Sequence, residues 1–183
     1  MNRRLILFSA MIVFGSLSHA QKYFTKNGKV SFFSKASLEN IKADNNQVLS
    51  VMDASTGAMQ FSLLNSAFHF PKALMEEHFN SDYIESAKYQ KSTFSGNISD
   101  MTKVDFKKDG TYAVTVSGDL NIHGVIKKVT APGTIVIKDG KPTASSTFNI
   151  LLADYNITIP KMVQENISKT IQISVSCKYE PKN

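Results

Sequence analysis

Histidine and carboxylate side chains could perform acid–base chemistry or bind a metal ion, and histidines are few in this chain. Beyond residue 20 they are His69, His78 and His123, and their spacing matches no metal-binding motif. Glu76 and Glu77 precede His78, but adjacent residues on a helix point in different directions and do not converge on one ion. We therefore expect surface or structural hydrogen-bonding roles for the three histidines.

Asp119 and His123 are the one carboxylate–imidazole pair expected on a shared strand face. Four residues of extended chain span about 13 Å, so the two groups cannot touch unless the strand bends at Gly118 or the following hairpin turns sharply. The sequence contains no G-x-S-x-G motif, no glycine-rich phosphate loop after a strand and no paired cysteines. Catalysis therefore has weak support, and we expect no enzymatic activity.

Residues 109–129 contain the clearest structural pattern. Apolar side chains alternate with polar or small ones there, which predicts a half-buried antiparallel strand; the apolar positions are Tyr112, Val114, Val116, Leu120 and Ile122. Asp109-Gly110 and His123-Gly124 are turn signals at its two ends. Gly118 interrupts the apolar face and indicates a bulge, a bend or a close backbone approach.

Short alternating segments continue along the chain. The first strand is expected to turn at Asn27-Gly28, and residues 44–46 to form a turn between two short strands. Helical spacing begins at Pro71, which suits the first turn of a helix, and is expected to break at Asn80-Ser81. A further turn is expected at Asp139-Gly140. Pro160 is expected to end a strand through residues 157–159, and one or two amphipathic helical turns are expected to follow over residues 162–167. With about eight or nine strands and no repeating strand–helix unit, the pattern predicts an all-β chain with small helical insertions, an antiparallel barrel or sandwich.

Residues 1–20 have the features of a cleavable signal peptide: a basic start, an apolar run over 5–14 and small residues at Ser18 and Ala20. The apolar run is too short to span a membrane, and no cysteine at the cleavage site could accept a lipid. We expect cleavage after Ala20, a secreted or periplasmic protein without a transmembrane anchor, and one domain over residues 21–183.

The charge of this expected mature chain is mildly basic. The 183-residue chain has a formal charge of +6; without Arg3 and Arg4, 19 lysines face 15 acids, a net charge of +4. No arginine remains for bidentate contacts and the lysines are scattered, so we expect no nucleic-acid partner. The single cysteine, Cys177, cannot form an internal disulfide; because it lies in phase with the apolar residues of the last strand, we expect it to be buried.

The apolar strand faces supply the candidate binding residues. An antiparallel barrel of about eight strands either fills its interior with side chains or holds one small ligand, and periodicity does not distinguish these two states. The inward candidates are aromatic and aliphatic: Phe61, Leu63, Phe68, Phe70, Phe94, Tyr112, Val114, Val116, Phe148, Ile150, Ile171, Ile173 and Val175.

The segment Gly118–Val125, reading GDLNIHGV, followed by Lys128-Val129, resembles the most recognisable hairpin of the YceI-like family, secreted polyisoprenoid-binding proteins of bacteria. Further segments match in the expected order and cover residues 22–179: Phe68-His69-Phe70, Leu74–Asn80, Tyr83–Ser86, Thr93–Gly96 and Asp154–Ile157. Asn121 and Ile126 depart from the threonines common in relatives, and residues 39–56 do not match.

The resemblance implies a lipocalin-like antiparallel β-barrel of about eight strands, with a helix after Phe70 near one opening. It also implies a long isoprenoid threaded through an apolar lumen. The leading hypothesis is a secreted or periplasmic protein that binds an amphiphilic isoprenoid lipid, a polyisoprenoid or a quinone, without catalysis and without another cofactor or metal. Because no arginine is present to bind a pyrophosphate, a quinone or another neutral isoprenoid is favoured as the ligand over one bearing a pyrophosphate.

The alternative is a filled barrel that acts as a structural or protein-interaction module, and a weaker one is an enzyme acting on an isoprenoid through Asp119 and His123. The oligomeric state is open, a dimer included.

Overall fold

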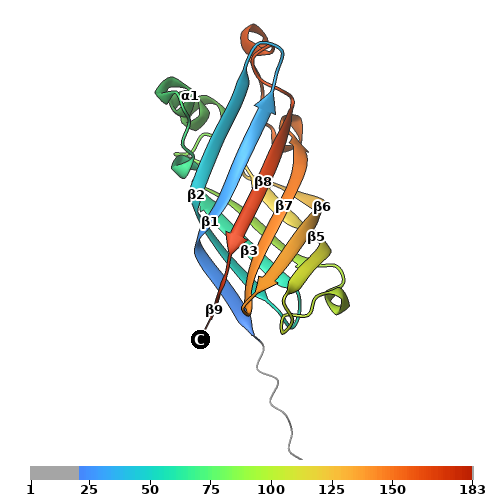
Figure 1. Ribbon diagram of the computed structural model, residues 1–183. Helices are drawn as coiled ribbons and strands as arrows, with labels where there is room; N and C mark the ends of the chain where they lie inside the picture. Colours follow the sequence, from blue (N-terminus) through green and yellow to red (C-terminus); the bar gives the residue numbers. More distant parts are fainter. Residues whose placement is uncertain (1–20, 183) are drawn as a thin grey trace, which may run out of the picture.

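Nine antiparallel strands form one sheet in the computed structural model, which describes residues 21–182 (Figure 1). The strands are β1 (Lys22–Lys35), β2 (Asn40–Asp53), β3 (Ala58–Leu64), β4 (Lys91–Ile98), β5 (Gly110–Ile122), β6 (Val125–Lys138), β7 (Lys141–Leu151), β8 (Thr170–Lys178) and β9 (Glu180–Pro181). Their order is β2-β3-β4-β5-β6-β7-β8-β1-β9, and pairing of β1 with β2 closes the ring. The predicted all-β barrel is confirmed, with β9 as a short addition beside β1.

Two tight hairpins follow the predicted turn signals. His123 and Gly124 join β5 to β6 with φ of 53° and 74°, and Asp139 and Gly140 join β6 to β7 with φ of 51° and 71°. Positive φ at both central residues is the backbone of a type I′ turn, whose twist matches that of the flanking strands. The β5–β6 hairpin is therefore in register from Gly110 opposite Ile137 to Ile122 opposite Val125.

The predicted helix after Phe70 is present as α1 (Ala73–His78) and continues as one π-helical turn over Phe79–Tyr83. The break expected at Asn80-Ser81 does not occur, because Ile84 N–H reaches back to Phe79 O at 2.9 Å. Short 3₁₀ turns cover Asn65–Ala67, Met101–Lys103, Leu152–Tyr155 and Lys161–Val163. None of the helices within residues 21–182 combines the length and the apolar character needed to cross a membrane. The expected signal peptide lies outside the described residues.

Two turns predicted near the N-terminus are strand irregularities instead. β2 runs unbroken through residues 44–46 because Asn45 is buried, donates from its amide to Leu64 O at 2.9 Å and accepts from Gln47 N at 2.9 Å. Asn27-Gly28 is a shift in the β1–β2 register within one continuous strand. Asparagine favours turns only where tertiary hydrogen bonds do not hold it in a strand.

The strand expected over residues 157–159 is also absent. The chain leaves β7 through the turn at Leu152–Tyr155, where Asn156 has a left-handed φ of 56°, and Ile157 N–H then donates to Leu152 O at 3.1 Å. Ile157 is buried beside Tyr155, so its apolar character serves packing rather than strand pairing. The helical character expected after Pro160 is confirmed only as a single 3₁₀ turn.

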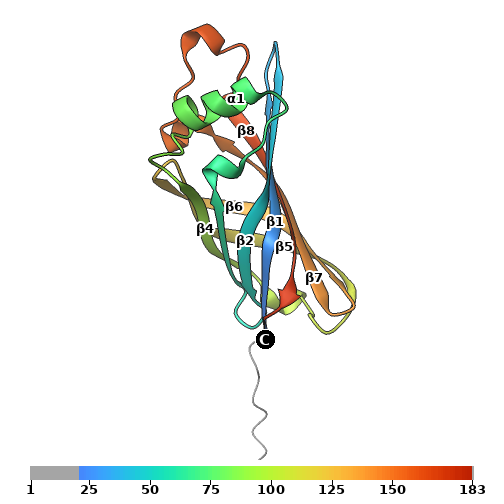
Figure 2. The same cartoon turned by 90° about the vertical axis from the view of Figure 1, so that its left-hand side faces the viewer.

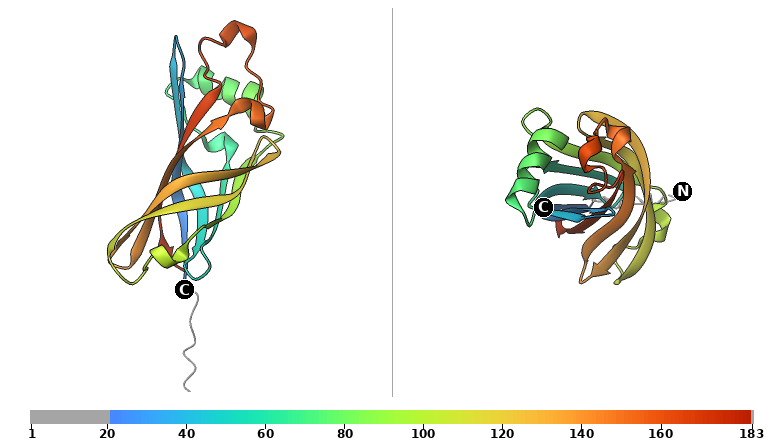
Figure 3. Two further views of the ribbon diagram at one scale, coloured as in Figure 1. Left: turned by 90° about the vertical axis from the view of Figure 1, so that its right-hand side faces the viewer. Right: turned by 90° about the horizontal axis from the view of Figure 1, so that it is seen from above.

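The two ends of the barrel differ. Figures 1 and 2 place α1 and the loop between β7 and β8 at one end, and β9 with the start of β1 at the other. The β9 end is packed by a cluster of buried side chains that includes Tyr23, Met52, Ile137 and Tyr179. Seen from above, the strands curve around a common axis with α1 to one side (Figure 3). Met162, in the loop between β7 and β8, borders the interior and is 96% exposed, so the interior opens at the α1 end.

Cys177 belongs to the packed end, and its predicted burial is confirmed. A Cβ atom at Gly28 would lie 2.6 Å from Cys177 Sγ, so the glycine in β1 makes room for the sulfur. Burial raises the pKa of the Cys177 thiol to about 12. Burial also raises the pKa of the neighbouring Tyr179 hydroxyl, which lies 2.7 Å from the Ser50 hydroxyl.

We expect the thiol to make folding stability depend on alkaline pH. The thiol of the unfolded chain ionises near its ordinary pKa of 9.0, whereas the folded thiol keeps its proton to about pH 12. The buried thiol therefore contributes its full stabilisation of the folded state below about pH 9 and loses it as the pH rises toward 12. At about pH 11 the loss is on the order of 3 kcal/mol. Urea unfolding of wild type and Cys177→Ala at several alkaline pH values measures it. The stability difference between the two proteins should shrink as pH rises; parallel profiles would contradict this account.

Candidate binding cavity

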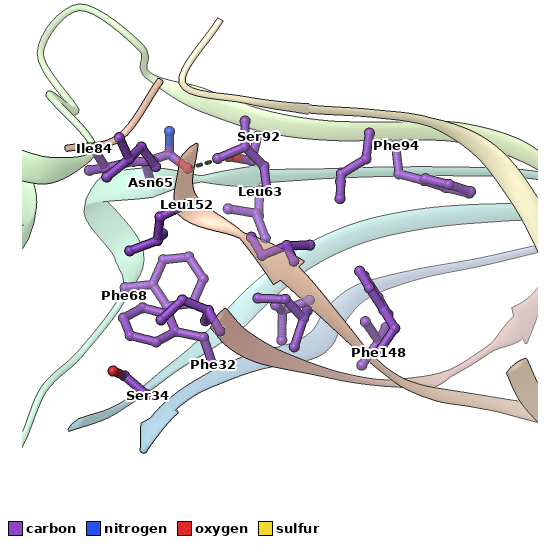
Figure 4. Close-up of a pocket in the computed structure, with 18 of the residues that line it drawn as sticks. Phe32, Ser34, Leu63, Asn65, Phe68, Ile84, Ser92, Phe94, Phe148 and Leu152 are labelled. Carbon is purple, nitrogen blue, oxygen red and sulfur yellow. Dashed lines mark hydrogen bonds between the residues drawn. The ribbon is translucent and has the colours of Figure 1, made fainter. Parts of the chain in front are cut away.

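The barrel encloses a cavity of about 660 Å³ whose wall is formed by side chains from β1 to β8 and from the helical segment around α1. Figure 4 shows aromatic and aliphatic side chains pointing into this space from opposite strands. Pockets for single small ligands commonly have volumes of about 300–1,000 Å³. The interior of the barrel is therefore hollow, whereas the alternative of a filled module requires it to be packed.

The structure places all but one of the sequence-predicted lumen residues in the cavity wall: Phe61, Leu63, Phe68, Phe70, Phe94, Val114, Val116, Phe148, Ile150, Ile171, Ile173 and Val175. Tyr112 lies outside the wall. It shares their strand face but stands near the start of β5, where it packs against the closed end and its hydroxyl donates to Lys108 O at 2.9 Å.

Several wall residues are only partly buried although they point inward. Phe61, Val114 and Val116 fall in this class, whereas Ile135 and Ile137 on β6 are almost fully buried. An inward apolar side chain remains accessible only where no opposite side chain covers it. Apolar surface left open in this way is stabilised by about 25 cal/mol per Å² when an apolar ligand covers it.

Four phenylalanines gather below the helical segment at the open end. Phe32, Phe68, Phe70 and Phe79 form five ring pairs with centroid separations from 5.2 to 5.6 Å. All four line the cavity, so the segment that carries Phe79 forms part of its wall. Pairs at these distances stabilise the packing beyond simple area burial. Sequence periodicity missed Phe32 as a lumen residue, although Val30, Phe32 and Ser34 alternate along β1.

A few polar groups interrupt the apolar wall, and sequence patterns gave no signal for them. Asn65 is almost fully buried; its amide donates to Tyr89 O at 2.6 Å, and its Oδ1 accepts from the Ser92 hydroxyl at 2.7 Å (Figure 4). Ser34 is equally buried, and Glu39 and Asp82 also line the cavity. Each follows or interrupts an apolar run, so hydrophobic periodicity could not identify it.

Asp119 and His123 are not brought together. Asp119 is exposed on the outside of β5, 3.9 Å from Lys128 Nζ. His123 is nearly buried at the hairpin tip: Nε2 lies 2.7 Å from Glu85 Oε2, Nδ1 lies 3.1 Å from Tyr155 O, and the Tyr89 ring covers it at 4.3 Å. Neither residue lines the cavity. His123 instead ties the β5–β6 hairpin to the segments after α1 and β7.

The other two histidines are exposed, and His78 also lines the cavity. His69 Nδ1 is 3.7 Å from Glu76 Oε2, and His78 Nδ1 is 2.8 Å from Asp82 Oδ2. The His78 hydrogen bond holds the pKa of Asp82 below its usual range, so this carboxylate is ionised at neutral pH. Within residues 21–182, histidine, cysteine and acidic side chains form no group of three or more that could hold a metal ion.

Several solved structures share this fold. A polyisoprenoid binding domain from Saccharophagus degradans implicated in plant cell wall breakdown has 16% identity and a TM-score of 0.73, covering 89% of this chain and 99% of that one. BcnA of Burkholderia cenocepacia has 18% identity and a TM-score of 0.68, covering 84% and 96%. The YceI protein of Campylobacter jejuni has 14% identity and a TM-score of 0.52, covering 100% and 99%.

At these identities the structural likeness shows the fold alone. Comparison with curated protein sequences gave no match. The family profile is more specific, because the YceI-like domain matches residues 10–179, most of the chain. The resemblance carried by the Gly118–Val125 hairpin is thereby confirmed, and the chain belongs to the YceI-like domain family.

Proposed function

We propose that this protein holds one long apolar lipid, a polyisoprenoid, a quinone or a related chain, in its barrel and carries it without catalysing a reaction on it. The observation that carries the proposal is the hollow, apolar interior of about 660 Å³, lined by side chains that remain partly accessible. The name of the Saccharophagus degradans domain, which describes polyisoprenoid binding, supports the ligand class.

The physical basis is the transfer of methylene groups from water to a dry lumen. Each buried methylene contributes about 0.8 kcal/mol, so a chain of many carbons binds without a specific polar contact. Ordering of a flexible chain offsets part of this gain. An elongated apolar lumen therefore recognises chain length and apolar character first, and the head group second.

We further propose that the protein acts outside the cytoplasm, in the periplasm or as a secreted protein. The proposal rests on the signal-peptide pattern of residues 1–20. A lipid carrier in an aqueous compartment must shield its ligand from water, and a closed barrel does so on all sides except its open end.

The experiment is gentle mass spectrometry of the protein purified without detergent from its native host, followed by organic extraction. We expect a polypeptide that begins at Gln21 and carries one stoichiometric lipid, which extraction releases for identification. A clean apo mass together with no uptake of added isoprenoids would overturn the lipid-carrier proposal. An intact residue 1–20 segment would overturn the proposed location and leave the carrier role standing.

A further inference from the structure

The charged residues around the cavity decide which head group a bound ligand can carry. The apolar lumen itself selects only an apolar tail. Among the wall residues in the described part of the chain there is no lysine or arginine, whereas two carboxylates, Glu39 and Asp82, are present beside one histidine, His78. Phosphate groups bind where several N–H or ammonium donors converge. The wall of this cavity has the opposite character.

The two carboxylates of the wall already have partners. Lys72 Nζ lies 2.6 Å from Glu39 Oε1, and the His78 ring lies 2.8 Å from Asp82 Oδ2. A diphosphate arriving at the open end would have to compete with each carboxylate for its partner and would face the carboxylates as like charges. Such juxtaposition disfavours a charged ligand and leaves an uncharged one unaffected.

Ser34 supplies a hydrogen-bond donor at the same end. The inward alternation of Val30 and Phe32 along β1 ends at Ser34, which lines the cavity and is 1% exposed (Figure 4). Its Oγ accepts the Ser168 N–H at 2.8 Å, and no described residue accepts the hydroxyl proton. Because a buried donor without an acceptor is unfavourable, a ligand oxygen at this point would be stabilised.

We propose that the lumen selects a lipid with an uncharged head group bearing an acceptor oxygen, such as a quinone carbonyl, which receives the Ser34 hydroxyl at the open end, and that it discriminates against isoprenoid diphosphates. This inference rests on the proposed lipid-binding function and specifies its ligand class. The apolar tail then extends past the phenylalanine cluster toward the closed end. Head-group selection thus depends on one donor and on the two paired carboxylates.

The test compares three probes that share a tail of four isoprene units: a menaquinone, geranylgeraniol and geranylgeranyl diphosphate. Binding to residues 21–183 is measured by titration calorimetry below the aggregation concentration of each probe. We expect the menaquinone to bind about tenfold or more tightly than the diphosphate at moderate salt. Failure of all three probes to bind would count against the proposed function itself. Equal or tighter binding of the diphosphate would overturn only the head-group inference.

Two substitutions separate the contributions. Ser34→Ala should weaken menaquinone binding roughly threefold to tenfold and leave a hydrocarbon of the same tail unchanged. Ser146→Ala is the matched control, because Ser146 also lines the cavity but its hydroxyl already donates to Pro132 O at 2.7 Å. Glu39→Gln releases Lys72 and should strengthen diphosphate binding several-fold in a salt-dependent manner. If Ser34→Ala weakened the hydrocarbon equally, Ser34 would have a structural role and the inference would fail.

Discussion

Replacing Val116 with tryptophan is expected to prevent lipid loading while the barrel remains folded. Val116 lies on β5 with its side chain in the cavity wall and only partly buried, so a larger ring can enter the open volume without displacing a packed neighbour. If the indole displaces only two ligand methylenes, the loss is about 1.6 kcal/mol, which is more than tenfold in affinity. Menaquinone titration and native mass spectrometry both measure this loss.

Val136→Trp is the matched control for that experiment. Val136 lies on the adjacent strand β6 but points outward and is 39% exposed, between the buried Ile135 and Ile137. A tryptophan there adds the same ring outside the lumen and should leave lipid binding at the wild-type level. Equal binding by both variants would show that the lipid does not occupy the lumen at Val116.

The second large effect is expected for Gly118→Ala, which should reduce the free energy of unfolding by about 3 kcal/mol through overpacking. Gly118 on β5 stands directly opposite Gly96 on β4. A Cβ at Gly118 would lie 2.5 Å from Gly96 Cα and 2.7 Å from Phe94 Cζ, and closer still to Ser95 O. Since two of these atoms belong to the backbone, relief requires the strands to move apart.

Gly133→Ala tests whether this cost is specific. Gly133 also lies within a strand, but its added Cβ would meet Ser145 O at 3.2 Å and Val114 Cγ2 at 3.3 Å. Small shifts relieve such contacts, so we expect a loss of about 1 kcal/mol or less. Urea unfolding curves fitted with one common m-value give the loss in the free energy of unfolding for both variants. Similar losses for the two variants would refute the proposed close approach of β4 and β5.

Alternation in the sequence predicted which side of each strand faces inward, because successive side chains point to opposite faces. It also indicated that Gly118 marks a bulge, a bend or a close backbone approach, and the structure shows the last of these beneath the Phe94 ring. Alternation does not specify where along the barrel axis a given inward side chain lies. Tyr112 therefore shares the inward face of Val114 and yet lies beyond the cavity, in the packed end.

The polar part of the site could not be predicted from the same pattern. Ser34, Asn65 and Ser92 look like strand ends or loop residues, and only the folded barrel brings them into one wall. Whether the barrel is hollow depends on strand number and tilt, which set its width, and on side chains from opposite strands. Local turn preference likewise failed at Asn45, where a hydrogen bond to Leu64 O holds the residue in β2.

One strand pairing within the closed barrel joins distant parts of the chain and affects how the protein folds. β1 must pair with β8, with Val30 opposite Val175, although nearly the whole chain separates them. Contacts between such distant residues have a high entropic cost of loop closure, and all-β proteins dominated by them commonly fold in milliseconds to seconds. Until β8 docks, the apolar inner faces are open to solvent and to other chains. A lipid that covers those faces early would therefore act as a folding aid as well as cargo.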